Sequence, residues 1–127
     1  MAATNRPAAL APLTASNVAL LTTFRRNGDA VSTPVSIALN GDRVYFVTAS
    51  DSGKAKRLAH SALVTLAPCT KSGKVLGDTV SGRARLLESQ ERKRAAMLLP
   101  TKPLFGSFLM YRLKGKTMLL FEVVSEN

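Results

Sequence analysis

The sequence predicts a mainly β protein, in which about six antiparallel strands and two or three short helices form one small barrel or strongly twisted sheet. Runs of strand-forming residues recur along the chain, and Asn-Gly turn signals separate the first three of them. The 127 residues are 46% hydrophobic and 20% charged, which is typical of one globular domain. Closing such a sheet into a barrel removes its exposed edges.

The first three strands are expected in close succession. The run from Val18 to Arg25 is rich in strand formers and ends at Asn27-Gly28, a two-residue hairpin signal. From Ala30 to Leu39 larger apolar residues alternate with smaller ones, as in a half-buried strand. A second turn signal at Asn40 to Asp42 leads into the apolar run from Arg43 to Ala49.

Pro34 interrupts the second predicted strand. Proline has no N–H to give to a strand ladder, so this position is expected at a sheet edge, at a bulge, or where another group approaches the backbone. An edge kink and a bound ligand both remain open here.

The second half of the chain predicts three more strands and a helix. Strands are expected from Ala62 to Cys69, from Gly77 to Glu88 and from Lys116 to Val124. A helix is expected from Ser89 as its N-cap to Pro100 as its end.

The segment before the first strand contains Pro7 and Pro12 and lacks an unbroken apolar stretch of the signal-peptide type. We expect residues 1–15 to be a flexible N-terminal arm and residues 16–127 to form a single domain. No apolar run is long enough to span a bilayer, so no membrane insertion is expected. The single cysteine, Cys69, cannot form an internal disulfide, which favours a cytoplasmic location.

The formal net charge of +10 predicts an anionic partner. Nucleic acid, an anionic membrane surface and phosphorylated small molecules all qualify. The cations lie in scattered small groups without interleaved aromatic residues, so nucleic-acid binding is the weaker interpretation. One His and one Cys also make a protein metal site improbable, and we expect none.

The strongest local signal lies between Thr48 and Ala62. Apolar residues there follow helical spacing, while Lys54 and Arg57 lie on one flank of the helix that begins near Ser52-Gly53. A helix start beside hydroxyls and cations can bind a phosphate or another anion. The alternative is an N-capped surface helix with solvated cations.

Other candidate residues have simpler interpretations. His60, at a helix end, is expected on the surface, and Cys69 is expected to pack or to line a pocket. The cations Arg92 to Arg94 are expected on a solvated helix face, although they could also hold part of an acidic ligand. No paired carboxylates for acid–base catalysis are visible.

Four segments occur in an order and spacing that resemble a known family: "LLTTFRRNGDAVSTPV", "GDRVYFVTASDSGKAKRL", "VTLAPCTKSGKVLG" and "SGRARLL". They resemble the pyridoxamine-phosphate-oxidase-like split-barrel flavoproteins, and more closely their actinobacterial F420-dependent oxidoreductases. The resemblance is strong from Val18 to Leu87 and weak in the C-terminal third.

This resemblance implies a six-stranded antiparallel Greek-key split β-barrel that forms a homodimer, with two cofactors in grooves at the subunit interface. It implies two sets of cofactor-binding positions. In the first set, the residues that contact the cofactor phosphate and tail are Thr48, Ser50, Ser52, Lys54, Lys56 and Arg57. In the second set, the residues that contact the ring system are Thr33, Pro34, Val35, Ala67 and Pro68.

The activity that the resemblance implies is hydride transfer from C5 of reduced coenzyme F420 to an electron-poor small molecule, such as an activated alkene, a quinone or a tetrapyrrole. The cofactor supplies the chemistry, and the sequence identifies no catalytic residue. The alternatives are an FMN-binding oxidoreductase of the same fold, or a non-catalytic protein that binds F420, a flavin or haem. Ser36-Ile37 stand where relatives often carry an aromatic pair, so the resemblance gives no specific substrate.

Overall fold

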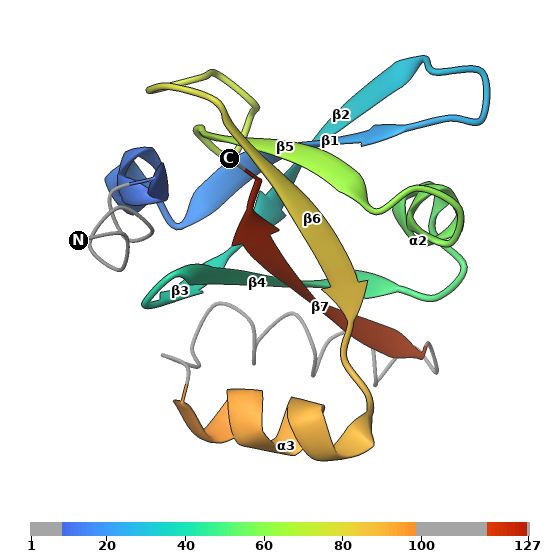
Figure 1. The fold of residues 1–127 in the computed structure, drawn as a ribbon. Helices are drawn as coiled ribbons and strands as arrows, with labels where there is room; N and C mark the ends of the chain where they lie inside the picture. Colours follow the sequence, from blue (N-terminus) through green and yellow to red (C-terminus); the bar gives the residue numbers. More distant parts are fainter. Residues whose placement is uncertain (1–8, 99–116, 127) are drawn as a thin grey trace.

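The computed structural model describes residues 9–98 and 117–126 (Figure 1). Seven strands in these residues form one curled antiparallel sheet in the order β2-β1-β5-β6-β7-β4-β3. The predicted mainly β split barrel is thereby confirmed. The strands are β1 (Val18–Phe24), β2 (Ala30–Ser36), β3 (Ala38–Asn40), β4 (Arg43–Ala49), β5 (Leu63–Pro68), β6 (Val80–Leu86) and β7 (Met118–Ser125). Beside them lie η1 (Ala11–Ala15), α2 (Gly53–Leu58) and α3 (Ser89–Leu98).

The seventh strand arises because the predicted strand over residues 30–39 breaks at Ile37. β2 pairs with β1 as far as Ser36, which lies opposite Val18, the first residue of β1. The N–H of the buried Ile37 then donates to the carbonyl of Asn17 (2.9 Å), and β3 continues by pairing with β4. The two halves of one predicted strand therefore stand at opposite ends of the strand order, which curls the sheet.

The two predicted hairpins differ in their turns. The first was expected to be a two-residue turn at Asn27-Gly28. Instead, Arg25 N–H donates to Asp29 O and Gly28 N–H donates to Arg25 O (both 2.9 Å), so the loop has three residues. Gly28, with φ of +92°, takes the left-handed position of that wider loop. The β3–β4 turn does have two residues, and Gly41, with φ of +62°, is the first of them.

The main core lies inside the curled sheet. Phe46 on β4 and Phe121 on β7 stack there, with ring centroids 5.4 Å apart. Their buried neighbours come from both sides of the barrel and include Leu21 on β1 and Leu66 on β5. This packing fixes the positions of the strands that carry the site.

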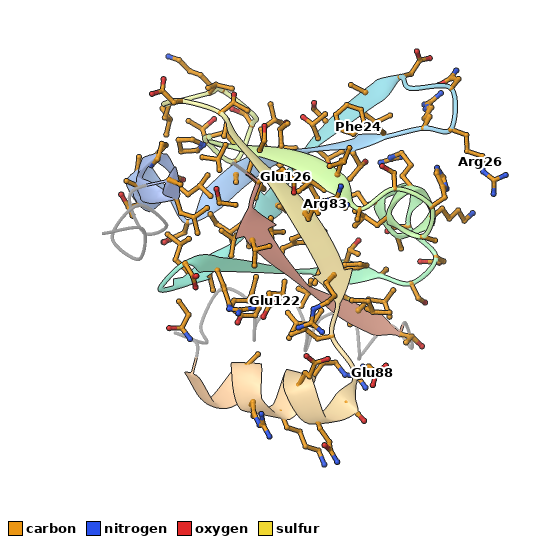
Figure 2. All side chains as sticks on the ribbon, in the orientation of Figure 1. Phe24, Arg26, Arg83, Glu88, Glu122 and Glu126 are labelled. Carbon is orange, nitrogen blue, oxygen red and sulfur yellow. The ribbon has the colours of Figure 1, made fainter. Side chains whose placement is uncertain are left out.

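Helix α3 covers the outer face of the sheet, below β4 and β7 in Figure 1. Its Ala95 packs with Leu87, Tyr45 and Leu120 in a second apolar cluster. On the same face the buried Glu122 accepts hydrogen bonds from Arg43 (2.6 Å), Arg85 (3.2 Å) and Tyr45 (3.1 Å), and Figure 2 shows its place on the sheet. Glu122 is therefore a structural carboxylate with its charge neutralised.

The N-cap of α3 is one residue earlier than expected. Glu88, not Ser89, occupies the position, because its carbonyl accepts from Arg92 N–H (2.9 Å) and its own N–H donates to Glu91 Oε1 (3.3 Å). The bond from the N-cap N–H to Glu91 is one half of a capping box, with Glu91 as its acid. The predicted helix end at Pro100 lies outside the described residues.

The expected N-terminal arm is packed onto the barrel where the structure describes it. η1 has Pro12 in its first turn, and Leu10 and Leu13 are buried in the main core. Two leucines at helical spacing were the sequence signal for this docking. Residues 1–8 of the expected arm lie outside the described residues. No helix of the described chain is long and apolar enough to cross a membrane.

Candidate functional site

Helix α2 begins directly after β4 because hydroxyl groups cap it. Ser52 is its N-cap and accepts a hydrogen bond from Ala55 N–H (3.0 Å), and Thr48 at the end of β4 bonds the same Ser52 hydroxyl (2.8 Å). Two of the predicted phosphate-contacting residues thus support the helix in the structure. Ser50 is exposed beside them, and its N–H donates to Thr117 O (2.9 Å).

The helix is shorter than its apolar spacing predicted. It has six residues and ends at Leu58, so Ala55 is buried and Leu58 packs against the core, while Ala59 is exposed. The helix dipole builds up along aligned peptide units, so one and a half turns contribute little of it. Any affinity for an anion must therefore come mainly from the side chains.

Arg57 turns back from α2 toward the sheet. Its Nε donates to Thr23 Oγ1 (2.5 Å), and Thr23, on β1, is only 1% exposed. The guanidinium lies over Gly53, where a Cβ would stand 2.8 Å from Nη1. Gly53 therefore leaves room for this conformation, and Arg57 is fixed at two points instead of extending into solvent.

Lys54 lies beside Arg57 and is half-buried. Burial first, and then the positive charge of Arg57, hold the pKa of Lys54 below its usual value. Lys54, Lys56 and Arg57 lie within four consecutive residues of this helix. Neighbouring cations favour the binding of an anion.

The predicted residues of β2 lie on an edge strand. Pro34 is exposed there, which confirms the expectation that it occupies a sheet edge. Val35 is buried. Thr33 Oγ1 is buried and has no hydrogen-bond partner in the part of the chain that the structure describes. An unpaired buried hydroxyl is unusual and could bond a ligand.

β1 brings the α2 group and the β2 group to one face of the sheet. Thr33 lies opposite Leu21, and two residues along β1 Thr23 lies opposite Val31. Residues two apart on a strand point to the same face, about 7 Å apart. The Arg57–Thr23 contact and the Thr33 hydroxyl therefore share the inner face. Sequence reasoning missed Thr23, although it continues the buried alternation of Ala19 and Leu21.

The predicted ring contacts on β5 are covered. Ala67 and Pro68 are buried. The loop after β5 passes close by, since a Cβ on Gly77 would stand 3.0 Å from Pro68 Cγ and one on Gly73 would stand 3.6 Å from Pro34 Cγ. Of the ring positions, Pro34 alone is exposed. The described residues thus fit a phosphate-bearing cofactor through Lys54, Arg57 and Thr33 better than through β5.

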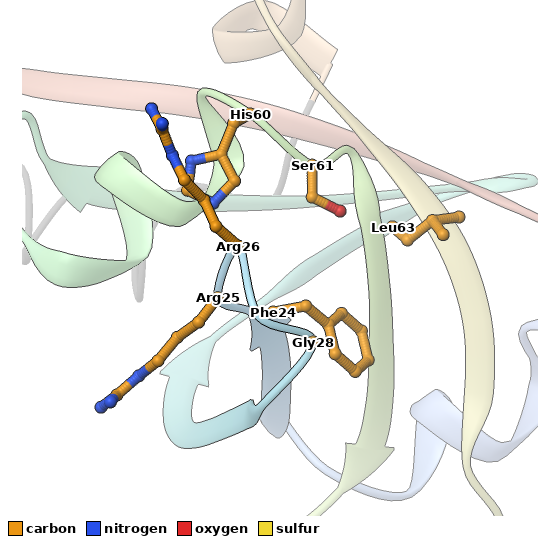
Figure 3. Close-up of a pocket in the computed structure, with 7 residues that line it drawn as sticks. All are labelled: Phe24, Arg25, Arg26, Gly28, His60, Ser61 and Leu63. Carbon is orange, nitrogen blue, oxygen red and sulfur yellow. The ribbon is translucent and has the colours of Figure 1, made fainter.

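A second concave surface was not expected from the sequence. It has a volume of about 570 Å³ and opens beside the C-terminal end of α2 (Figure 3). Phe24 and Leu63 are its apolar lining residues. The remaining lining residues are Arg25, Arg26, Gly28, His60 and Ser61.

Comparison with known proteins decides the family. Residues 6–120 match the family description of pyridoxamine 5'-phosphate oxidase. The chain belongs to this family. The match covers most of the chain, including the α2 segment and the strands that carry the site. No curated protein matches the chain by sequence.

Solved structures share the fold at low identity. A heme-binding protein from Mycobacterium smegmatis has a TM-score of 0.68 at 17% identity, and the match covers 94% of this chain and 50% of that one. A FAD-binding protein from Mesorhizobium loti has a TM-score of 0.62 at 15% identity, covering 92% and 84%. A domain-swapped dimer has a TM-score of 0.61 at 20% identity, covering 84% and 79%. These likenesses support the fold of this family member.

Proposed function

We propose that this family member is an F420-dependent oxidoreductase that transfers a hydride from the reduced deazaflavin to an electron-poor small molecule. The observation that carries the proposal is the group of three cations on α2, Lys54, Lys56 and Arg57, in which Arg57 is held over Gly53 by its bond to Thr23. F420 carries an acidic tail beyond its phosphate, so it has more negative charge than FMN. A protein with a net charge of +10 suits the more anionic coenzyme.

The residues of the chain would bind and orient the cofactor. Lys54 and Arg57 would hold its phosphate, because the two cations lie beside each other and Arg57 is held in place by its bond to Thr23. The buried Thr33 hydroxyl would donate to a polar edge of the ring system. Pro34, exposed on the edge strand, would border the ring where no neighbouring strand pairs. The deazaflavin, when bound, supplies the hydride chemistry.

The proposal includes a homodimer whose interface borders the cofactor groove. A similar structure is a domain-swapped dimer. Val75 and Leu76, 49% and 50% exposed, are large apolar side chains on the loop that approaches Pro34 and Pro68. A second copy packed on this loop would close a groove beside Pro34. The single free and buried Cys69 is consistent with the cytoplasmic location that we also propose.

Calorimetric titration of the purified protein with F420, and separately with FMN, tests the cofactor. We expect F420 to bind at least about tenfold more tightly. Lys54→Ala/Arg57→Ala should weaken F420 binding by at least about tenfold, which corresponds to 1.4 kcal/mol. Lys93→Ala/Arg94→Ala, which removes the same charge from exposed positions on α3, should leave the affinity within about twofold.

Each other outcome has a defined meaning. Binding of FMN alone would replace F420 by FMN in the same fold. Binding of haem alone, as the similarity to a heme-binding protein allows, would remove the reductase proposal. Tight F420 binding without oxidation of the reduced coenzyme by any quinone or activated alkene in a screen would favour a non-catalytic carrier.

A further inference from the structure

The concave surface beside the end of α2 is separate from the Arg57–Thr23 site. Phe24, which lines it, follows Thr23 on β1, and consecutive strand residues point to opposite faces of a sheet. Thr23 points inward and is buried, so Phe24 points outward. The two sites therefore lie on opposite faces of the same strand.

Backbone hydrogen bonds fix both walls of this surface. On the hairpin side, the bonds from Arg25 N–H to Asp29 O and from Gly28 N–H to Arg25 O (both 2.9 Å) hold the turn. On the helix side, the N–H groups of His60 and Ser61 both donate to the carbonyl of Arg57 (3.3 and 3.1 Å). The lining side chains thus project from two ordered loops.

The charge of the surface is positive on balance, since Arg25 and Arg26 outnumber the Asp29 carboxylate of the same hairpin. Asp29, the carboxylate of the hairpin, accepts a hydrogen bond from Asn27 Nδ2 (3.2 Å), and its N–H donates to Asn27 Oδ1 (3.0 Å). Across the described ranges, 9–98 and 117–126, no carboxylate forms an ion pair with Arg25 or Arg26. The surface therefore presents cationic donors to solvent.

The lining divides into a polar side and an apolar side. In Figure 3, Arg26 and His60 extend toward one side, the Phe24 ring and Leu63 lie toward the other, and Ser61 stands between them. Leu63 is 44% exposed, so it presents apolar area at this surface. A volume of about 570 Å³ is in the range of small-molecule sites, roughly 300–1,000 Å³.

We propose that this surface binds a small aromatic carboxylate. The carboxylate would accept hydrogen bonds from Arg26, Ser61 and His60, because a guanidinium pairs with carboxylates through parallel N–H donors. The aromatic body would lie on Phe24 and Leu63, which removes their apolar area from water. The proposal does not depend on the F420 assignment, since it uses none of the residues placed at the cofactor.

The test uses 2-naphthoate as the probe and 2-naphthamide as its uncharged match. Titration of the ¹⁵N-labelled full chain should give saturable binding of naphthoate with a Kd below about 1 mM. The chemical-shift changes of the backbone N–H groups should centre on Arg26, Gly28, His60, Ser61 and Leu63. 2-Naphthamide should bind at least about fivefold more weakly than 2-naphthoate, as loss of an exposed ion pair predicts.

Two variants and one control locate the interaction. Arg26→Ala should weaken naphthoate binding about fivefold, and Leu63→Glu should weaken it at least about tenfold, because it removes an apolar contact and adds a like charge. Lys93→Ala, with the same loss of charge on α3, should bind as the parent does. F420 affinity, measured in parallel, should not change in Arg26→Ala, which separates this site from the proposed cofactor site.

Three results would overturn the proposal. They are an absence of saturable binding at 5 mM probe, equal binding of the acid and the amide, and shifts centred on Lys54 instead of Ser61. Tighter binding of oligothymidylate than of naphthoate, with shifts at the same amides, would assign the surface to single-stranded nucleic acid.

Discussion

At the scale of single residues, the site depends on side chains held in costly positions. Arg57 bonds a buried threonine, Lys54 is half-buried next to it, and Thr33 has a buried hydroxyl without a partner among the described residues. The burial of Lys54 and the unpaired Thr33 hydroxyl lower the stability of the free protein, whereas the Arg57 bond satisfies the buried Thr23 hydroxyl. Stability and binding should therefore change in opposite directions at Lys54 and Thr33.

Replacing Thr33 by Val separates the two effects. Val has nearly the same shape and removes the unpaired hydroxyl, so we expect the free energy of unfolding to rise by about 1 kcal/mol. F420 affinity should fall about fivefold, because one hydrogen bond to the cofactor is lost. Urea unfolding and calorimetry measure the two quantities. A less stable variant would show that the hydroxyl has a partner in the folded chain.

Replacing Lys54 by Met tests the lowered pKa. Folding lowers the pKa of Lys54, so the charged lysine destabilises the folded chain at any pH below that lowered pKa. As the pH rises from the lowered pKa toward the ordinary lysine value near 10.4, the folded chain loses this proton first and the destabilisation is relieved. Lys54→Met should therefore raise Tm at pH 7 by about 2 °C. The stability of the parent should rise relative to that of the variant over that alkaline window, because Tyr45, whose pKa is raised by burial, titrates in both proteins. Thermal unfolding across pH checks both, with the exposed Lys56→Met as the control.

At the scale of elements, the strands meet where small residues allow close approach. Gly82 on β6 is buried, and a Cβ there would stand 2.6 Å from Val123 Cγ1 and 2.7 Å from the carbonyl of Val124. A backbone carbonyl cannot move away without disturbing the β6–β7 ladder. The absence of a side chain at Gly82 is therefore a condition for this pairing.

Gly82→Ala should lower the free energy of unfolding by about 2 kcal/mol, because overpacking of this kind typically costs 1–3 kcal/mol. Denaturant unfolding followed by circular dichroism measures the change. Gly41→Ala is a useful comparison, since its added Cβ would meet nothing within 4 Å and its cost would come from the positive φ alone. An unchanged midpoint for Gly82→Ala would mean that β6 and β7 can separate at this point.

The elements also show what the sequence could predict. β4 begins and ends where its apolar run predicted, at Arg43 and Ala49, because a short apolar run that follows a turn signal is a local pattern. The break at Ile37 depends on where β1 starts, and the Arg57–Thr23 bond joins residues 34 apart in the chain. Such long-range contacts have no local pattern, so Lys54 and Arg57 could be proposed from spacing while Thr23 could not.

At the scale of the whole molecule, charge and apolar surface are distributed unequally. On the β4–β7 face under α3, two arginines pair with the buried Glu122, whereas the cations of α2 and of the β1–β2 hairpin, Lys54, Lys56, Arg57, Arg25 and Arg26, outnumber the acidic residues beside them. The exposed Val75 and Leu76 lie on the loop that approaches Pro34. Helix α2 precedes β5 and this apolar loop follows it, so the positive charge around α2 and the exposed apolar side chains lie at opposite ends of β5 (Figure 1).

Val75→Lys/Leu76→Lys tests whether this loop carries the dimer. The two side chains are about half exposed, so their further burial is worth about 1 kcal/mol each, and a two-fold interface counts each residue twice. The double variant should therefore lose about 4 kcal/mol of the free energy of dimerisation, which weakens the association of two chains by several hundred-fold. Sedimentation velocity should therefore find the parent as a dimer and the variant as a monomer with unchanged circular dichroism.

The variant should also bind F420 more weakly, since its groove would lack the wall that the partner subunit supplies. A variant that stays dimeric would place the interface elsewhere, and a monomeric parent at 50 µM would end the dimer proposal.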